Sequence, residues 1–189
     1  MSMTRTNSSS KTKTSTYKLK GKEVSLMDTT TKKSMSMSSC IDQEEAIIKS
    51  LNAEEKEWYL TSKKNFYENR MDTSCKDRLG PVSPGYICFI DYGCATYGRE
   101  MGYQHLGIVL SVFNGKAFVV PLTSNQSQLE VSTHMTLLED EALNKPSVVI
   151  LNDAKYIATS RIISFIGKIS DKNLNDLRYK VIGGIIENG

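Results

Sequence analysis

The chain has 189 residues, a net charge of +3 at neutral pH and a hydrophobic fraction of 39%. This length suits one domain of ordinary size with an appendage, and the low apolar fraction indicates that part of the chain stays outside a core. No apolar run approaches the roughly 20 residues of a membrane-spanning helix, no signal-peptide pattern opens the sequence, and the cysteines and histidines lack zinc-ligand spacing. We therefore expect a cytoplasmic protein with no membrane contact and no metal site.

The first 39 residues are the most basic part of the chain. They contain eight Lys and Arg residues against two acidic ones, are rich in Ser and Thr, and have few branched apolar side chains. Such a composition buries too little surface to offset the entropy lost on ordering, so we predict a disordered basic tail over 1–39. The tail is either an arm that contacts RNA or an acidic partner, or a solvated segment without a partner.

Residues 40–79 are predicted to form a helical extension and a linker. The pattern indicates two helices, over 42–51 and 53–69, and Asn52 followed by Glu55 resembles a capping box at the start of the second. An aromatic cluster on this extension either packs onto the domain that follows or forms a second interface for a partner; it consists of Trp58, Tyr59, Phe66 and Tyr67. Glycine and proline residues mark 71–84 as the link to the next domain.

The region 80–189 is typical of a small β-barrel. Three apolar runs predict strands over 86–90, 106–113 and 117–122, and the Asn114-Gly115 dipeptide between the last two predicts a type I′ hairpin turn. A glycine-bearing loop, 93–103, separates the first two strands. Further elements are predicted in chain order: a strand or strand pair over 129–138, a helical turn over 139–143, and strands over 147–151 and 156–159. Residues 162–169 are either a strand or a helix-strand corner, and a helix over 171–187 follows with an N-cap at Ser170.

The order of these features resembles the MazF/PemK family of toxin endoribonucleases. The matching pieces, in chain order, read GYICFID at 85–91, GREMG at 98–102, PLTS at 121–124, PSVVILN at 146–152, and an Arg-Ile pair at 161–162 followed by IGKI at 166–169. The resemblance covers about residues 80–189. It implies a mainly β fold with α: a small SH3-like (CcdB/PemK-like) β-barrel with a C-terminal helix, here preceded by the helical extension and the disordered tail.

RNA cleavage without a metal requires deprotonation of the 2′-hydroxyl, stabilisation of the phosphorane oxygens and protonation of the 5′-oxygen. The resemblance places the catalytic threonine of the family at Thr123, with Ser124 beside it, but puts His105 where the family has an arginine. Either His105 acts as general acid or base and Arg99 supplies the positive charge, or His105 is structural and the protein is a degenerate or repurposed toxin.

The 93–103 loop carries the residues expected to contact RNA. Tyr97 and Tyr103, with Tyr92 beside the loop, offer aromatic faces on which unpaired bases can stack, unless one or more of them closes the barrel end. Gly98 and Glu100 belong to the family-like loop motif. A carboxylate would repel the phosphodiester, so Glu100 is expected to orient Arg99 or His105.

The resemblance implies a toxin-type endoribonuclease that cleaves single-stranded RNA, in particular mRNA, by metal-independent attack of the 2′-hydroxyl. It further implies a homodimer, a cognate antitoxin protein as partner, and no cofactor. The alternative is a non-catalytic binding module on the same barrel that acts on a protein or RNA partner, as CcdB-like gyrase poisons do by protein binding alone.

Overall fold

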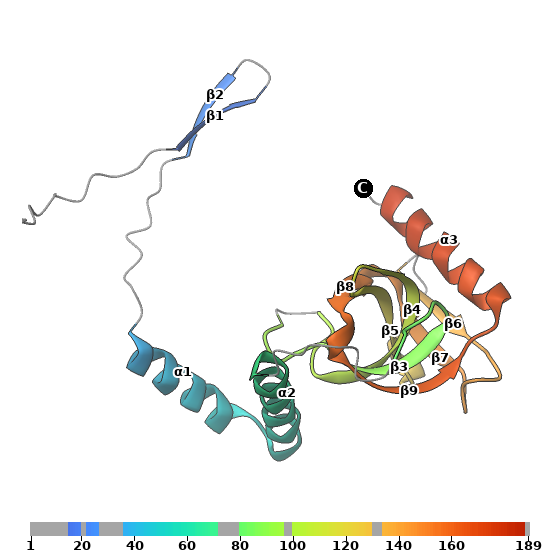
Figure 1. Cartoon of the computed structure of the whole chain (residues 1–189), viewed down its shortest axis with the longest axis horizontal. Helices are drawn as coiled ribbons and strands as arrows, with labels where there is room; N and C mark the ends of the chain where they lie inside the picture. The colour runs from blue at the N-terminus through green and yellow to red at the C-terminus, as the bar shows by residue number, and fades with distance from the viewer. Residues whose placement is uncertain are drawn as a thin grey trace, which may run out of the picture. The chain divides into compact units, whose positions relative to one another are not determined.

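The computed structural model describes the backbone of residues 15–19, 22–26, 36–71, 80–96, 100–129 and 134–187 (Figure 1). The chain divides into two compact units, residues 1–47 and 48–189. Helix α1 (Met37–Ser50) begins in the first unit and ends in the second. Its start is capped by Ser36, whose Oγ accepts a hydrogen bond from the backbone N–H of Ser39 at 3.1 Å.

The first unit contains a two-stranded hairpin within the segment that was expected to be disordered. Strands β1 (Ser15–Leu19) and β2 (Lys22–Leu26) pair antiparallel, with Tyr17 opposite Val24. β-Branched and aromatic residues favour extended backbone, although a lone hairpin is marginally stable in water. Helix α1 also begins two residues before the predicted end of that segment. The expected tail otherwise lies outside the described residues, apart from Ser36 itself.

Helix α2 (Ala53–Met71) starts where the sequence predicts. The backbone N–H of Glu55 donates to Asn52 Oδ1 at 2.9 Å, and the backbone N–H of Asn52 donates to Glu55 Oε2 at 3.3 Å. These two bonds satisfy two donors that the first helical turn leaves unpaired, which confirms the capping box. The linker residues 72–79 lie outside the described residues.

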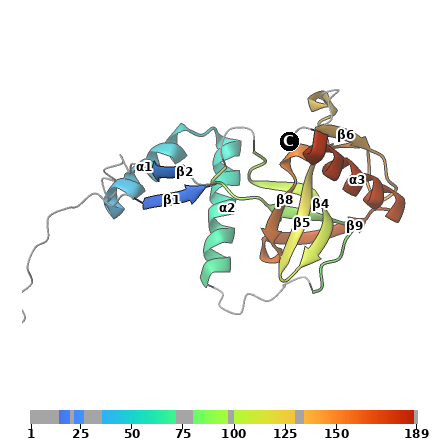
Figure 2. The ribbon, with the colours of Figure 1, turned by 90° about the horizontal axis from the view of Figure 1, so that it is seen from above.

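The second unit is built on an antiparallel sheet of seven strands that curls into a small barrel (Figures 1 and 2). The strands are β3 (Tyr86–Asp91), β4 (Gln104–Phe113), β5 (Lys116–Thr123), β6 (Met135–Leu138), β7 (Ser147–Ile150), β8 (Lys155–Ala158) and β9 (Ile162–Lys168). Their order is β6-β7-β5-β4-β3-β9, and β8 pairs with the other end of β5. Three 3₁₀ turns interrupt the chain, η1 (Gln126–Gln128), η2 (Leu151–Asp153) and η3 (Thr159–Arg161). The predicted barrel is confirmed.

The β4–β5 hairpin turns through Asn114 and Gly115, with φ of 47° and 72°. Positive φ at both central residues of a two-residue loop matches the predicted type I′ turn. By contrast, the predicted helical turn over 139–143 is a non-helical turn. The Asp140 carboxylate accepts hydrogen bonds from the backbone N–H groups of Ala142 at 3.0 Å and Ser170 at 2.9 Å, and these bonds hold the local chain in the turn. The predicted strand over 129–138 is present from Met135 onward, and residues 130–133 lie outside the described residues.

The central strands bury both of their faces. One face packs against the C-terminal helix α3 (Asp171–Glu187), which contributes Leu174, Leu177 and Val181 to a cluster with Ile87, Ile108, Leu110, Val120 and Leu122. The other face forms a second cluster of Cys88, Ile90, Tyr92, Val109, Ala117, Val119, Ile157 and Ile162. Burial raises the pKa of the Cys88 thiol to about 11, so this cysteine packs as a small hydrophobic residue.

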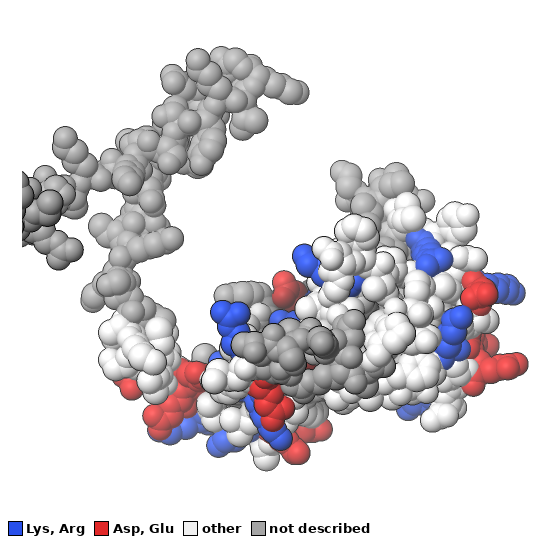
Figure 3. All heavy atoms as spheres, in the orientation of Figure 1, with Lys and Arg blue, Asp and Glu red and all other residues white. Residues whose placement is uncertain are grey.

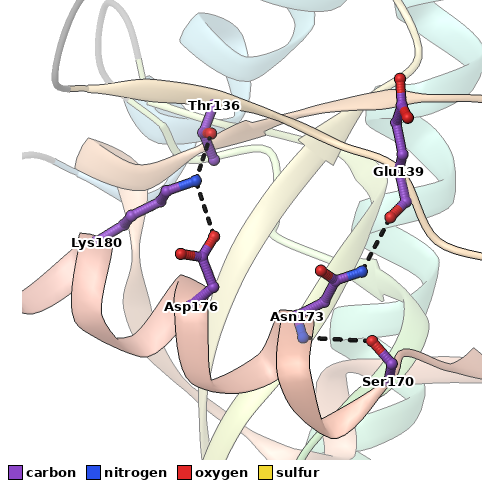
Figure 4. Close-up of polar contacts among 6 residues, drawn as sticks. All are labelled: Thr136, Glu139, Ser170, Asn173, Asp176 and Lys180. Atoms are coloured by element: carbon purple, nitrogen blue, oxygen red, sulfur yellow. Dashed lines mark hydrogen bonds and ion pairs between the residues drawn. The ribbon is translucent and has the colours of Figure 1, made fainter.

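Polar contacts fix α3 on the barrel (Figure 4). Ser170 Oγ accepts from the backbone N–H of Asn173 at 3.3 Å, which confirms the predicted cap, and Asn173 Nδ2 donates to the carbonyl of Glu139 at 2.9 Å. Lys180 Nζ lies 2.8 Å from Asp176 and donates to Thr136 Oγ1 at 3.0 Å. These contacts hold α3 against one side of the sheet. Helix α2 lies on the opposite side of the barrel (Figures 1 and 2).

Replacing Gly107 of β4 by alanine is expected to lower the free energy of unfolding by about 1–3 kcal/mol, the usual cost of overpacking. A Cβ at this position would overlap the Tyr92 hydroxyl and lie 2.7 Å from Ile90 Cδ1, both in the second core cluster. In α3, a Cβ at Gly183 would meet no heavy atom within 4 Å, so Gly183→Ala should instead raise the stability by up to about 1 kcal/mol. Urea unfolding of both variants measures the difference, and equal shifts would contradict it.

Candidate functional site

The start of β4 and the end of β5 lie side by side at one end of the barrel. Leu106 pairs with Leu122, so His105 and Thr123 are the next residues along the two neighbouring strands. On its other side His105 pairs with Ile90 of β3. Directly opposed residues of an antiparallel pair share one face of the sheet. Two of the residues that the sequence proposed as catalytic, His105 and Thr123, thus come from neighbouring strand ends.

The His105 side chain is half-buried. Its removal from water disfavours the charged imidazolium and lowers the pKa of His105 below its ordinary value. At neutral pH the imidazole is therefore predominantly neutral. A neutral imidazole has a lone pair that can accept a proton, which is what a general base needs.

Thr123 ends β5 and begins a local turn. Its Oγ1 accepts a hydrogen bond from the backbone N–H of Asn125 at 3.2 Å, and Asn125 Oδ1 in turn accepts from the backbone N–H and the hydroxyl of Ser127. The Thr123 hydroxyl accepts in this turn, so its proton can be donated to another oxygen. Ser124, the next residue, is exposed.

The loop between β3 and β4 is closed at its base by two backbone hydrogen bonds of 2.7 Å, from Tyr92 N–H to the Tyr103 carbonyl and from Tyr103 N–H to the Gly93 carbonyl. Farther along, the N–H of Met101 donates to Asp153 Oδ2 at 2.6 Å, and Asp153 pairs with Lys155 at 2.8 Å. Glu100 is exposed. Tyr97, Gly98 and Arg99 lie outside the described residues, so the roles proposed for them stay predictions.

Tyr103 contacts the helical extension. Its ring centroid lies 6.0 Å from that of Trp58 in α2, and its φ of 54° is an unusual value for an aromatic residue. Partial burial, followed by the negative charges of Glu55 and Cys94, raises the pKa of the Tyr103 phenol, which keeps it protonated. Part of the aromatic extension therefore packs on the loop, which is one of the two roles considered for it.

Tyr92 is buried, so it offers no stacking face to RNA and fits the alternative that a tyrosine closes the barrel end. Only 8% of the residue is exposed, and among the described residues its hydroxyl has no hydrogen-bond partner. Burial, with smaller contributions from Asp153 and Cys88, raises the pKa of Tyr92 strongly. Tyr92 instead belongs to the second core cluster, in the space left by Gly107.

Asp91 joins the extension to the loop, a role that the sequence did not reveal. This buried carboxylate accepts hydrogen bonds from Ser62 Oγ and Asn65 Nδ2 of α2, each at 2.7 Å, and from the backbone N–H of Gly93 at 2.9 Å. Gln104 Nε2 donates to Ser62 Oγ at 2.6 Å. The only signal in the sequence was an acidic residue directly after an apolar strand, and it did not identify the partners.

Arg161, at the end of η3, also contacts the base of the loop. Its Nη1 donates to the backbone carbonyl of Asp91 at 3.1 Å. Among the described residues it forms no ion pair with a carboxylate. The guanidinium is exposed apart from this contact.

Over the part of the chain that the structure describes, no three His, Cys, Asp or Glu side chains gather in an arrangement that could hold a metal ion. No helix in that part is long and apolar enough to cross a membrane. On the face shown in Figure 3, acidic and basic side chains of the barrel are interspersed, as its near-zero net charge predicts.

The fold and the paired strand ends define a small SH3-like barrel protein with a polar site at one end of the barrel. A family model described as "PemK-like, MazF-like toxin of type II toxin-antitoxin system" matches residues 83–182, just over half of the sequence. The chain belongs to this family. The tail and the two helices that precede residue 83 are outside the match.

Several solved structures resemble the barrel. MazF (Form-I) from Deinococcus radiodurans is 18% identical, with a TM-score of 0.46 over 56% of this chain and 96% of that one. An endoribonuclease in complex with its cognate antitoxin from a mycobacterial species is 12% identical, with a TM-score of 0.44 over 56% of this chain and 95% of that one. The MazE–MazF complex (Form-II) from Deinococcus radiodurans is 16% identical, with a TM-score of 0.41 over 56% and 94%. No curated protein matches the chain.

Proposed function

We propose that this protein is a cytoplasmic, metal-independent endoribonuclease that cleaves single-stranded RNA, in particular mRNA, as the toxin of a toxin–antitoxin pair. The observation that carries the proposal is the juxtaposition of His105 and Thr123 at adjoining strand ends in a chain of the PemK/MazF family. No cofactor takes part. The antitoxin protein is proposed from the family description, and the homodimer from the resemblance to the family.

In the proposed reaction, neutral His105 accepts the proton of an RNA 2′-hydroxyl. The 2′-oxygen attacks the adjacent phosphorus, the bond from phosphorus to the 5′-oxygen breaks, and that oxygen leaves as a hydroxyl after taking a proton from solvent. Imidazolium then returns its proton to solvent. The products are a 2′,3′-cyclic phosphate and a 5′-hydroxyl end.

Three further side chains stabilise the negative charge on the phosphorane. Thr123 donates its hydroxyl proton to a non-bridging oxygen, and Ser124 is placed to do the same from the next position. Arg99 supplies positive charge, oriented by Glu100. Oxyanion stabilisation of this kind is often the largest contribution to such catalysis. Tyr97 and Gly98 contact the RNA beside the cleaved bond. The part of the Tyr103 ring that does not contact Trp58 also contacts the RNA there.

The histidine in place of the family's arginine favours one alternative, a non-catalytic module that binds an RNA or protein partner. The two functions differ in a direct assay. A binding module forms a complex with RNA or protein and leaves long RNA intact.

Purified protein in EDTA is expected to cut a long single-stranded RNA into discrete fragments that carry 5′-hydroxyl ends. The same RNA with 2′-O-methyl groups throughout should stay intact, because it has no 2′-hydroxyl to attack. Gel analysis with end labelling reads out both results. Intact RNA in the first reaction, from folded protein, would contradict the proposed activity. Cleavage of the methylated RNA would contradict the proposed nucleophile.

A further inference from the structure

A pocket of about 450 Å³ opens between α2 and the barrel. Its walls are the second half of α2, the first residues of the β3–β4 loop and the η3 turn. The volume lies within the usual range of small-molecule sites, about 300–1,000 Å³. Since α2 precedes the family match, the pocket contains one wall that the family domain does not supply.

The pocket is positively charged. Lys63, Arg70 and Arg161 line it, and Asp91 is the single acidic residue on its walls. The Asp91 carboxylate faces three hydrogen-bond donors within the protein, so little of its charge is directed into the pocket. Neither arginine is ion-paired to a carboxylate in the described part of the chain. The positive charge of the pocket and the guanidinium N–H donors of the two arginines suit an anion with several acceptor oxygens, such as a phosphate.

The same pocket has an aromatic wall. Phe66 is 57% exposed, and its only ring contact among the described residues is with Tyr67 at 5.8 Å, edge to face. Asn69, one turn away, also lines the pocket and carries an amide that can pair with the edge of a base. Aromatic faces beside arginines are the combination that binds unpaired nucleotides, through stacking and phosphate contacts.

The pocket adjoins the candidate catalytic end of the barrel. Asp91 on its floor pairs with Gln104, the residue before His105, and both belong to strands joined by the 92–103 loop. An RNA strand that passes His105 can therefore continue over the base of this loop.

We propose that this pocket binds one unpaired nucleotide of the RNA substrate, with the base on Phe66 and the phosphate on Arg70 and Arg161, an inference that rests on the proposed function. The extension thus adds an RNA subsite to the family barrel. Affinity and choice of RNA then depend on α2 as well as on the loop.

The test measures binding of a labelled, mixed-sequence RNA with 2′-O-methyl groups throughout to the full chain by fluorescence anisotropy over a range of salt concentrations. Phe66→Leu keeps apolar bulk but removes the flat ring, and should weaken binding at least about fivefold, the lower limit for loss of one stacked base. Arg70→Ala should reduce the slope of log affinity against log salt by about 0.7, the value for one phosphate of a single strand. Both side chains are exposed, so the fold is retained.

Lys172→Ala on α3 is the matched control, an exposed cation outside the pocket, and should leave the affinity and the salt slope unchanged. Wild-type affinity and slope in both pocket variants would overturn the subsite and leave the proposed nuclease standing. No binding by the wild type would count against both. A separate titration with a nucleoside monophosphate distinguishes the source of the nucleotide: binding that Arg70→Ala abolishes, with unchanged oligonucleotide binding, would overturn RNA as the ligand.

Discussion

His105→Ala is expected to slow the cleavage of single-stranded RNA by about 10²- to 10⁴-fold, the usual contribution of a positioned general base. The half-buried imidazole is neutral at pH 7 because burial lowers its pKa, and it lies at the strand end beside Thr123. Removing it leaves the 2′-hydroxyl without a base. Single-turnover cleavage in EDTA measures the loss, and circular dichroism checks that the variant is folded.

The chain supplies its own control, since His134 is the other histidine. The His134 backbone carbonyl accepts hydrogen bonds from the N–H groups of Leu151 at 2.8 Å and Asn152 at 3.4 Å, and His134→Ala retains that carbonyl. This variant should cleave RNA at close to the wild-type rate. An equal loss of activity in the two variants, or no loss in His105→Ala, would contradict a role of His105 in the reaction. Arg99 and Thr123 would then be the candidates for any cleavage.

The pH dependence gives a second measure of the same role. A base acts in its deprotonated form, so wild-type kcat/KM should fall as the pH drops through the lowered pKa of His105, below 6.5, and should stay level above it. The acidic limb should disappear from the residual activity of His105→Ala. A limb that persists unchanged would belong to another group.

Asp91→Ala is expected to lower the free energy of unfolding by about 3 kcal/mol. The change removes three hydrogen bonds to a buried carboxylate and leaves the donors of buried Ser62 and half-buried Asn65 without their partner. Bonds to charged groups contribute about 1.5–3 kcal/mol each, and a stranded buried donor costs about 1–3 kcal/mol, with partial relief by rearrangement. Urea unfolding of the full chain measures the effect.

Asp176→Ala provides the comparison. Asp176 is an exposed carboxylate, and its ion pair with Lys180 should contribute less than about 0.5 kcal/mol.

A double-mutant cycle between Ser62 and Asp91 should show a coupling energy above 1 kcal/mol, roughly that of a charge-assisted bond. Additive effects of the two substitutions would mean that α2 does not depend on this contact.

The elements best predicted from the sequence are those specified by neighbouring residues. Three features depend on contacts within a few positions: the Asn114-Gly115 turn, the capping box at Asn52 and the apolar spacing of α3. The local sequence is therefore enough to predict them. The turn after Glu139 differs from the predicted helical turn because one of the two bonds to the Asp140 carboxylate comes from Ser170, thirty positions later in the chain. Pairing of β8 with β5 likewise depends on residues that lie far apart in the sequence.

The same distinction separates the residues of the candidate site that were predicted from those that were not. Family resemblance was enough to place His105 and Thr123 on adjoining strand ends, because the resemblance carries the fold of the whole barrel. It contained no information about α2, so the bonds of Ser62 and Asn65 to Asp91 were not predicted. The sequence did not decide whether Tyr92 is buried or exposed, since Asp91 before it and Gly93 after it favour a loop position. Arg99, Tyr97 and Gly98 remain predictions.

The bonds between α2 and Asp91 have a consequence for how this protein can change over generations. Ser62 lies before the family match, and it supports a loop inside that match, so residues on the two sides of the family boundary are no longer free to vary independently. Changes at Ser62, Asn65, Asp91 and Gln104 should therefore occur together among descendants of this sequence. A fragment that starts at residue 83 would contain the β3–β4 loop without the α2 residues that bond to Asp91.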